Sequence, residues 1–166
     1  METSTAVQNE KSQNVVLCDV PRSGNDVYRI SRSDYKGTRY LDLRIFFRSR
    51  ADATLMVPTT KGVTFPEKLR EDVIAGLIMA RKAEGVECPE GEQFRSVKVC
   101  EVPISETEHF RISKGSGAKN TFVDMRLFFQ KDGTYIPSKR KGVSILGGSL
   151  DEVITGLMRT EPEHAA

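Results

Sequence analysis

Residues 15–47 read VVLCDVPRSGNDVYRISRSDYKGTRYLDLRIFF, and residues 97–129 read VKVCEVPISETEHFRISKGSGAKNTFVDMRLFF. The two stretches align without a gap at an offset of about 82 residues, and about a third of the aligned positions are identical. After a turn of different length the similarity resumes, because VPTTKGVTF at 57–65 matches PSKRKGVSI at 137–145 and EDVIAGLIMA matches DEVITGLMRT. A two-copy repeat of roughly 65–70 residues is too short for a solenoid and indicates a fused dimer of one small unit.

The periodicity within each copy predicts four strands. Short β-branched runs at 15–20 and 27–32 flank a turn-forming cluster, PRSGND. The stretch RYLDLRIFF at 39–47 alternates, which places Leu41, Leu43, Ile45 and Phe47 on the inward face. A fourth strand runs through 55–65, and through 134–145 in the second copy. The proline in each fourth strand favours an edge position or a bulge.

A helix follows the strands in each copy. Pro66 is suited to the first turn of the first helix, whose apolar stripe comprises Leu69, Val73, Leu77 and either Met79 or Ala80. In the second copy Ser149 is the expected N-cap, and the stripe comprises Leu150, Val153, Ile154, Leu157 and Met158. The expected fold class is α+β, with β-β-β-β-α units at 14–83 and 95–160, a linker at 84–94, and disordered tails at 1–13 and 161–166.

One four-stranded sheet with one helix buries too little apolar surface to be stable alone. We therefore expect the two units to pack through their helices as an intramolecular pseudo-dimer in a monomeric chain.

Composition excludes several classes of protein. The 166 residues carry 25 Lys and Arg against 23 Asp and Glu, a net charge of +2, and include three cysteines and two histidines. The cysteines lack CxxC spacing, and no nucleophile–base set appears, so we expect no disulfide, metal site, cofactor, catalytic residue or enzymatic activity. No apolar run suggests a signal peptide or a membrane span. We expect an intracellular protein, in the cytoplasm or nucleoid or in the nucleus.

The near-neutral net charge hides basic sheets. Basic residues outnumber acids in the strands of both copies, whereas the acids gather in the tails, helices and linker. Aromatic residues such as Tyr35, Tyr40 and Phe122 are interleaved with these cations. This pattern suits a single-strand binder, in which cations follow the phosphates and rings stack on unpaired bases.

Plainer interpretations of the same residues stay open at this point. Alternating Arg and Asp also make an ordinary solvated sheet face with ion pairs. Alternation turns one phenylalanine of each Phe-Phe pair toward the core. Cys18 and Cys100 are expected to be small core residues. Gly62 and Gly142 are expected to serve backbone geometry.

The stretch DYKGTRYLDLRIFF, followed by a proline-containing turn, PTTKGVTF and a helix, resembles the single-strand-binding domain of the positive cofactor four family of transcriptional coactivators. Both copies fit the Asp-x-Arg strand of that family, and the second carries the fuller PSKRKGVSI. The resemblance implies a dimer built through helices, with sheets and loops that form channels for single strands.

The resemblance also implies roles for particular residues. Tyr35 matches a stacking aromatic, with Lys36 and Arg39 beside it, and Arg32 adds to the basic strand. The strand arginine, the aromatic that ends that strand and the lysine before glycine correspond to Arg44 and Arg126, Phe47 and Phe129, and Lys61 and Lys141.

The two copies depart from each other at the predicted site. The second copy has GSGAKN in place of the aromatic loop, so its binding is expected to rely on Lys114 and Lys119. The first copy has Thr59-Thr60 where the second has Ser138, Lys139 and Arg140. The two half-sites are therefore expected to be unequal.

These observations predict a largely sequence-independent single-stranded DNA-binding protein that acts as a transcriptional coactivator or regulator, or in replication and repair. The alternatives are a single-stranded RNA-binding protein and a protein-interaction module that has lost its nucleic-acid site. The sequence names no protein partner.

Overall fold

The structure is a computed structural model that describes residues 14–162. The predicted tail at 1–13 lies outside the described residues, as do residues 163–166 of the predicted tail at 161–166.

Each unit contains four strands followed by a short 3-10 turn and one helix. The first unit comprises β1 (Val15–Ser23), β2 (Asp26–Tyr35), β3 (Thr38–Arg48), β4 (Met56–Pro66), η1 (Glu67–Leu69) and α2 (Arg70–Lys82). The second comprises β5 (Phe94–Pro103), β6 (Glu108–Gly117), β7 (Thr121–Lys131), β8 (Thr134–Leu146), η2 (Gly147–Ser149) and α3 (Leu150–Leu157). The predicted α+β class with two β-β-β-β-α units is confirmed.

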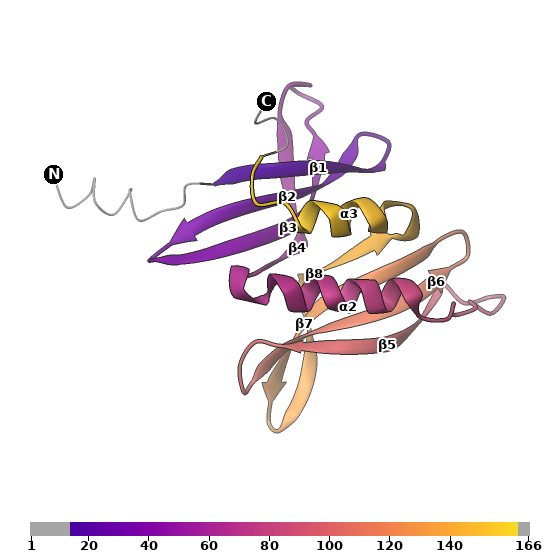
Figure 1. The fold of residues 1–166 in the computed structure, drawn as a ribbon. Coiled ribbons are helices and arrows are strands. Elements are labelled where there is room, and N and C mark those ends of the chain that lie inside the picture. Colours follow the sequence, from indigo (N-terminus) through magenta and orange to yellow (C-terminus); the bar gives the residue numbers. More distant parts are fainter. Residues whose placement is uncertain (1–13, 163–166) are drawn as a thin grey trace, which may run out of the picture.

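Within residues 14–162 the strands form one eight-stranded sheet in the order β1-β2-β3-β4-β8-β7-β6-β5 (Figure 1). Each half is an antiparallel meander, and the halves meet at a single parallel pair, Gly62 of β4 with Lys141 of β8. The edge position predicted from the prolines is therefore wrong, because β4 and β8 lie at the centre. The predicted bulge is present in both strands, where the register shifts beside Pro58 and Pro137.

Each helix covers the sheet of the other unit (Figure 1). Helix α2 packs on β5 and β6, and α3 packs on β1 and β2. Gly76 of α2 lies so close to the second half-sheet that a Cβ there would sit 2.5 Å from Ile112 Cδ1. Gly156 of α3 approaches Ile30 Cδ1 in the same way, at 2.6 Å. The helices also contact each other, as predicted. The chain is therefore a pseudo-dimer in which the two units have exchanged their helices.

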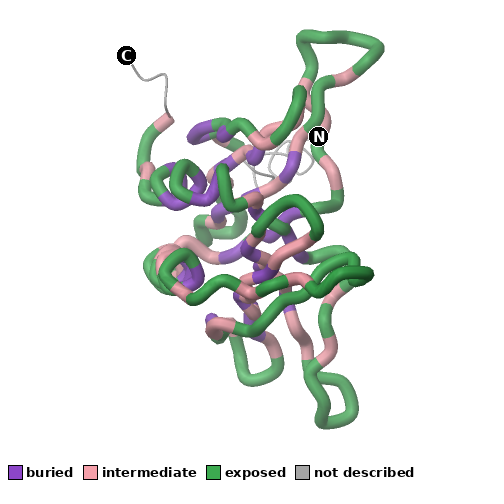
Figure 2. Tube along the Cα trace, turned by 90° about the vertical axis from the view of Figure 1, so that its right-hand side faces the viewer, coloured by how far each residue is buried: buried purple, intermediate pink, exposed green. Residues whose placement is uncertain are grey.

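The core lies between the helices and one face of the sheet (Figure 2). Leu41, Leu43 and Ile45 of β3 are buried as the alternation predicts. Phe47 continues the same parity but is 41% exposed, because the end of β3 projects beyond the helix layer (Figure 1). The expectation that one phenylalanine of each pair belongs to the core is wrong, since Phe46, Phe47, Phe128 and Phe129 are all at least partly exposed.

The predicted start of the first helix and the predicted capping bond of the second need correction, whereas Ser149 is the N-cap residue of α3 as expected. Pro66 ends β4, and the α-helix begins four residues later, after η1. Ser149 precedes α3, but its hydroxyl makes no capping bond and donates to Pro21 O of the first unit at 2.8 Å. The stripe residue of α2 is Ala80, whereas Met79 and Met158 are each 53% exposed.

A buried tyrosine ties the two half-sheets together. The Tyr28 hydroxyl on β2 donates to Ser144 O and accepts from Leu146 N of β8, both at 2.9 Å. Its counterpart in the repeat, Phe110, instead packs edge-on against Phe65 of β4, with ring centroids 6.2 Å apart. The core is therefore continuous across the junction between the units.

Candidate functional site

The face of the sheet opposite the helices is here called the open face. It carries the side chains that alternate with those facing the helices, namely Arg29, Ser31, Asp42 and Arg44 in the first unit and their counterparts in the second. On the second unit the open face forms a groove of about 570 Å³. The lining residues come from all four strands of that unit: Phe94, Ser96, Lys98, Arg111, Ser113, Phe122, Asp124, Arg126, Phe128, Ser144 and Leu146.

Aromatic rings stand at both ends of this groove. Phe94 and Phe122 form an edge-to-face pair at one end, with centroids 6.1 Å apart. At the other end the Arg111 guanidinium lies 3.9 Å from the centroid of Phe128, and His109 stacks parallel to that ring at 5.7 Å. Cations and ring faces therefore line one continuous surface, which can contact phosphates and bases together.

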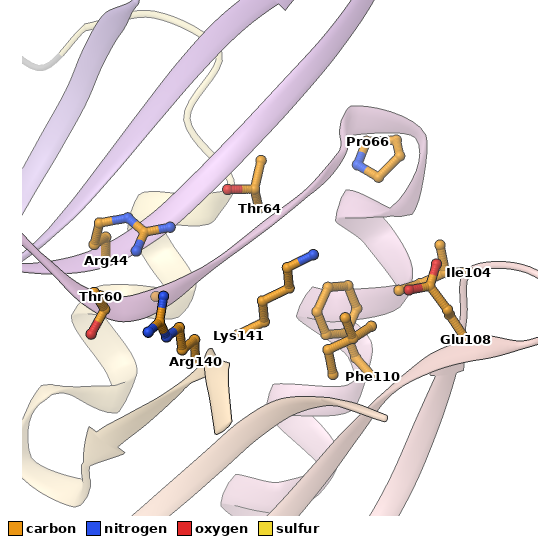
Figure 3. A pocket seen from close by; sticks show the side chains of 11 residues that line it. Arg44, Thr60, Thr64, Pro66, Ile104, Glu108, Phe110, Arg140 and Lys141 are labelled. Carbon is orange, nitrogen blue, oxygen red and sulfur yellow. The ribbon is translucent and has the colours of Figure 1, made fainter. Parts of the chain in front are cut away.

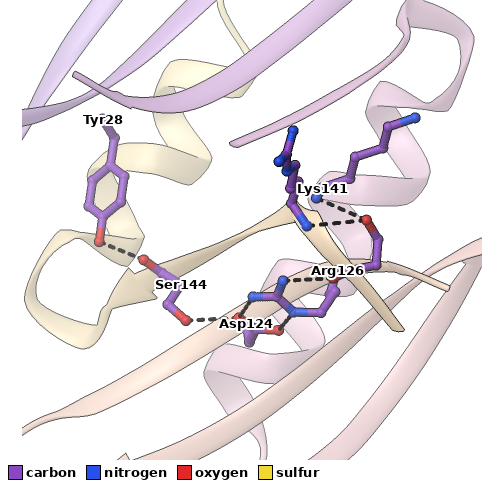
Figure 4. Close-up of polar contacts among 7 residues, drawn as sticks. Tyr28, Asp124, Arg126, Lys141 and Ser144 are labelled. Carbon is purple, nitrogen blue, oxygen red and sulfur yellow. Dashed lines mark hydrogen bonds and ion pairs between the residues drawn. The ribbon is translucent and has the colours of Figure 1, made fainter. Parts of the chain in front are cut away.

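An Asp–Arg pair occupies the same position on each open face. Arg44 donates to both carboxylate oxygens of Asp42 and, through Nη1, to Thr59 O at 3.0 Å. Arg126 repeats these bonds with Asp124 and with Ser138 O at 3.1 Å (Figure 4). The ion pairs run along one strand, so the plainer interpretation of a paired sheet face describes these two arginines well.

The glycines that face these arginines provide space for them. A Cβ at Gly62 would lie 2.7 Å from Arg44 Cζ, and one at Gly142 would lie 2.4 Å from Arg126 Cζ. The expected role in backbone geometry is therefore replaced by a steric one, because each arginine lies flat across the neighbouring strand.

The basic bulges lie where β4 meets β8. Thr59 Oγ1 accepts from Lys61 N at 3.1 Å, and Ser138 Oγ accepts from Lys141 N at 3.1 Å. By strand register Pro58 corresponds to Pro137, so the second bulge is one residue longer. It exposes Lys139, Arg140 and Lys141, whereas the first bulge exposes Lys61.

A hollow of about 390 Å³ opens beside these bulges, at the junction between the units (Figure 3). Arg44, Thr60 and Thr64 border it from the first unit, and Arg140 and Lys141 from the second. Glu108, Ile104 and Phe110 line the opposite wall (Figure 3). Residues from both units therefore meet at one basic surface.

The predicted residues of the first aromatic loop gather at the β2–β3 hairpin. Tyr35 is 44% exposed on the parity of the open face, and Lys36 Nζ lies 5.3 Å from its ring centroid. Lys36 adopts a φ of 49° in the turn. Arg39 pairs with Asp34 at 3.1 Å. In the second unit Lys119 is exposed in the corresponding hairpin.

Three predicted cations have the helix-facing parity, and one of them is Arg39, which shares the parity of the buried Leu41 on β3. Arg32 Nη1 donates to Thr160 O just beyond α3, and Lys114 Nζ donates to Arg81 O at 3.3 Å and Ala83 O at 2.6 Å, at the end of α2. Both side chains point toward the helices, because Arg32 follows the buried Ile30 by two residues on β2 and Lys114 follows the buried Ile112 by two residues on β6. Phe47 and Phe129 also follow the helix-facing parity and lie off the open face.

Sequence reasoning missed several lining residues of the groove as site residues. Arg111, Phe122 and Phe128 share the parity of Arg126 on paired strands, so the alternation was a usable signal. Phe94 was assigned to the linker at 84–94, yet it begins β5. Lys98 lines the groove beside a β-bulge between Lys98 and Cys100, and the sequence pattern does not predict this bulge.

The ion pairs on the open faces differ between the units. Asp19 accepts from Arg29 Nε at 2.8 Å and Nη2 at 3.0 Å, and this bonding raises the pKa of the Arg29 guanidinium. Its counterpart Glu101 binds Lys98 Nζ at 2.8 Å, and this bond holds the pKa of Glu101 below its ordinary value.

No helix in the described part of the chain is long and apolar enough to cross a membrane.

Comparison with known proteins supports part of this picture. Residues 25–75, from the turn before β2 into α2, match the family described as Transcriptional Coactivator p15 (PC4). A solved structure titled as crystal structures of Trypanosoma bruciei MRP1/MRP2 aligns over 95% of this chain and 89% of that chain, at 10% identity and a TM-score of 0.34. No curated protein gives a significant match.

Proposed function

We propose that this chain, whose residues 25–75 match the PC4 family, binds single-stranded DNA over its open faces and central basic bulges. The observation that carries the proposal is the groove of the second unit, in which Arg111 and Lys98 alternate with Phe94, Phe122 and Phe128. Such a surface tracks a phosphate backbone and stacks on bases that a duplex keeps paired.

The binding is largely independent of sequence. Ring faces accept any base, and cations contact phosphates, which carry no sequence information. Duplex recognition most often uses a helix in the major groove. Here α2 and α3 pack against the sheets, and their outer surfaces carry acids such as Glu71 and Glu152.

The proposed contacts are those that lie on or beside the open faces. They comprise the groove residues of the second unit together with Tyr35, Lys36, Lys61, Lys119, Lys139, Arg140 and Lys141. The matched family is described as a transcriptional coactivator, so we propose a role in transcription, with replication and repair as related settings for a free strand.

The test is a titration of the full chain with single-stranded DNA, single-stranded RNA and duplex of equal length at several salt concentrations. Each phosphate neutralised on a single strand contributes a slope of roughly −0.7 in log K against log salt, so about four to six contacts give a slope near −3 to −4. Equal affinity for duplex, or a slope near zero, would overturn the proposal. Preference for RNA over DNA would assign the chain to RNA instead.

A further inference from the structure

The two open faces differ in one pair of corresponding residues, Arg29 in the first unit and Arg111 in the second. Each lies opposite an acid on the neighbouring edge strand, because Arg29 pairs in register with Asp19 and Arg111 with Glu101. Each also lies over a phenylalanine ring, with the guanidinium carbon 4.6 Å from Phe46 in the first unit and 3.9 Å from Phe128 in the second. The two arginines therefore share a cross-strand acid and a phenylalanine ring.

Among the described residues, the acid forms an ion pair with this arginine in the first unit alone. Asp19 uses both carboxylate oxygens on Arg29. Glu101 instead places Oε1 on Lys98 and Oε2 3.3 Å from His109 Nε2. Within residues 14–162 Arg111 forms no ion pair, and its buried Nε has no hydrogen-bond partner.

The surrounding charges add to this difference. On the first open face Arg29 and Arg44 pair with Asp19 and Asp42, and Arg48 lies at the end of β3 on the same parity. In the groove of the second unit Lys98 stands where the first unit has Val16. Among the groove positions the second face therefore has one cation more than the first, between rings at both ends.

We infer that the open face of the second unit is the primary single-strand site of this chain, with Arg111 as the residue that gives it the advantage. This inference rests on the proposed function. The Arg111 guanidinium, stacked on Phe128, supplies a flat cation on which a base stacks or a phosphate docks. The face of the first unit is a secondary site, because Asp19 already occupies the corresponding guanidinium.

The experiment compares Arg111→Ala with the matched variant Arg29→Ala, in the full chain, by fluorescence anisotropy with labelled oligo-dT of about 16 nucleotides. Arg111→Ala is expected to weaken binding about tenfold and to flatten the salt slope by roughly 0.7. Arg29→Ala is expected to weaken binding less than Arg111→Ala does, because the charge of Arg29 is already paired with Asp19. Affinities are compared at a matched folded fraction from circular dichroism.

A gain-of-function variant makes the comparison independent of folding damage. Asp19→Asn releases Arg29 while keeping a side chain of the same shape, and it is expected to tighten binding and steepen the slope by up to about 0.7. If Arg111→Ala fails to fold, Arg111→Lys replaces it, since it keeps the charge but loses the flat stacking surface. Arg111→Lys should weaken binding while leaving the salt slope unchanged.

The outcomes separate this inference from the proposed function. A parent chain that binds no single strand would overturn both. A parent chain that binds, with Arg29→Ala as damaging as the Arg111 variants or with Asp19→Asn unchanged, would overturn the ranking of the faces and leave the proposed function standing.

Discussion

At the scale of single residues, the same steric arrangement appears twice at the centre of the sheet. An arginine lies flat across the adjacent strand, its guanidinium is held by an aspartate two residues earlier, and the position beneath it is a glycine. The glycine of the Lys-Gly pair in each copy, Gly62 or Gly142, is therefore needed because the arginine of the neighbouring strand packs directly over it.

Gly62→Ala tests this requirement. A new Cβ would lie 2.8 Å from both Cβ and Cγ of Arg44, and the Cβ atom moves only with the backbone of β3. We expect the free energy of unfolding in urea to fall by about 1–3 kcal/mol, as for overpacked sites. Gly142→Ala should cost less, because its close contacts are with the far end of the flexible Arg126 side chain.

The double variant Gly62→Ala with Arg44→Ala supplies the control. Arg44→Ala removes the close contacts with Cγ and Cζ and leaves only the contact with Cβ at 2.8 Å, so Gly62→Ala should cost less in this background than in the parent chain. A full destabilisation that persists in the Arg44→Ala background would contradict the steric explanation.

Tyr28 carries a pH-dependent contribution to stability. Burial is the main cause that raises the pKa of its hydroxyl above the ordinary value of about 10. The native state therefore holds this proton after the unfolded chain has lost it. The stabilising contribution is fully present below about pH 10 and is lost as the pH rises through the native pKa.

Tyr28→Phe should remove this contribution. At neutral pH we expect the free energy of unfolding to fall by about 1–3 kcal/mol, because Ser144 O and Leu146 N lose a buried partner. The gap between the parent chain and the variant, measured by urea denaturation from neutral pH upward, should narrow above about pH 10. A constant gap across that range would contradict the assignment.

At the scale of elements, alternation in the sequence carried most of the prediction. The strands and the inward faces of β3 and β7 follow from the period-two pattern, and the helix after each meander follows from its apolar stripe at helical spacing. The sequence does not say which sheet each helix covers, because the apolar stripe of α2 fits either half. The exchange is visible only in contacts such as that of Gly76 with Ile112.

Because the sequence does not show which half-sheet each helix covers, some predicted binding residues prove to have structural partners instead. Composition groups Arg32 and Lys114 with the other cations of the sheet. Their side chains lie on the helix-facing side, where they bind carbonyls at the ends of the exchanged helices. Ser149 looked like a cap, yet its hydroxyl was taken by Pro21 of the other unit. Local pattern cannot report a partner that lies on the other unit.

Lys114→Ala and Arg32→Ala are therefore expected to affect stability and spare binding. Each loses a charged donor at the carbonyl end of a helix, which should lower the free energy of unfolding by about 1 kcal/mol. Affinity for oligo-dT and its salt slope should match those of the parent chain at equal folded fraction. A slope flatter by roughly 0.7 for either variant would instead place that cation on a phosphate.

At the scale of the whole molecule, the exchange of helices means that neither unit contains its own complete core. Residues Leu17, Ile30 and Leu43 of the first half-sheet face α3, whereas α2 covers Ile112 and Cys100 of the second. A half cut from the chain would therefore expose the apolar face of its sheet and that of its helix at once.

The last prediction is that residues 14–86 and 87–162, expressed separately, do not form stable monomers. Each half alone should be unfolded or should associate with a second copy. The first half is suited to a homodimer, because its Gly76 would meet Cys18 and Ile30 where it now meets Cys100 and Ile112, the same residue types. Light scattering and urea denaturation of each half test this.

Mixing the halves in equal amounts should restore a one-to-one complex with the circular dichroism of the intact chain, because the cut falls in the irregular segment between α2 and β5. The intact chain measured at the same concentrations serves as the reference for mass and unfolding. A first half that is monomeric and unfolds cooperatively would show that α2 is able to fold back on its own sheet. The exchange would then be one of two accessible packings, since the stripe of α2 would satisfy both half-sheets equally well.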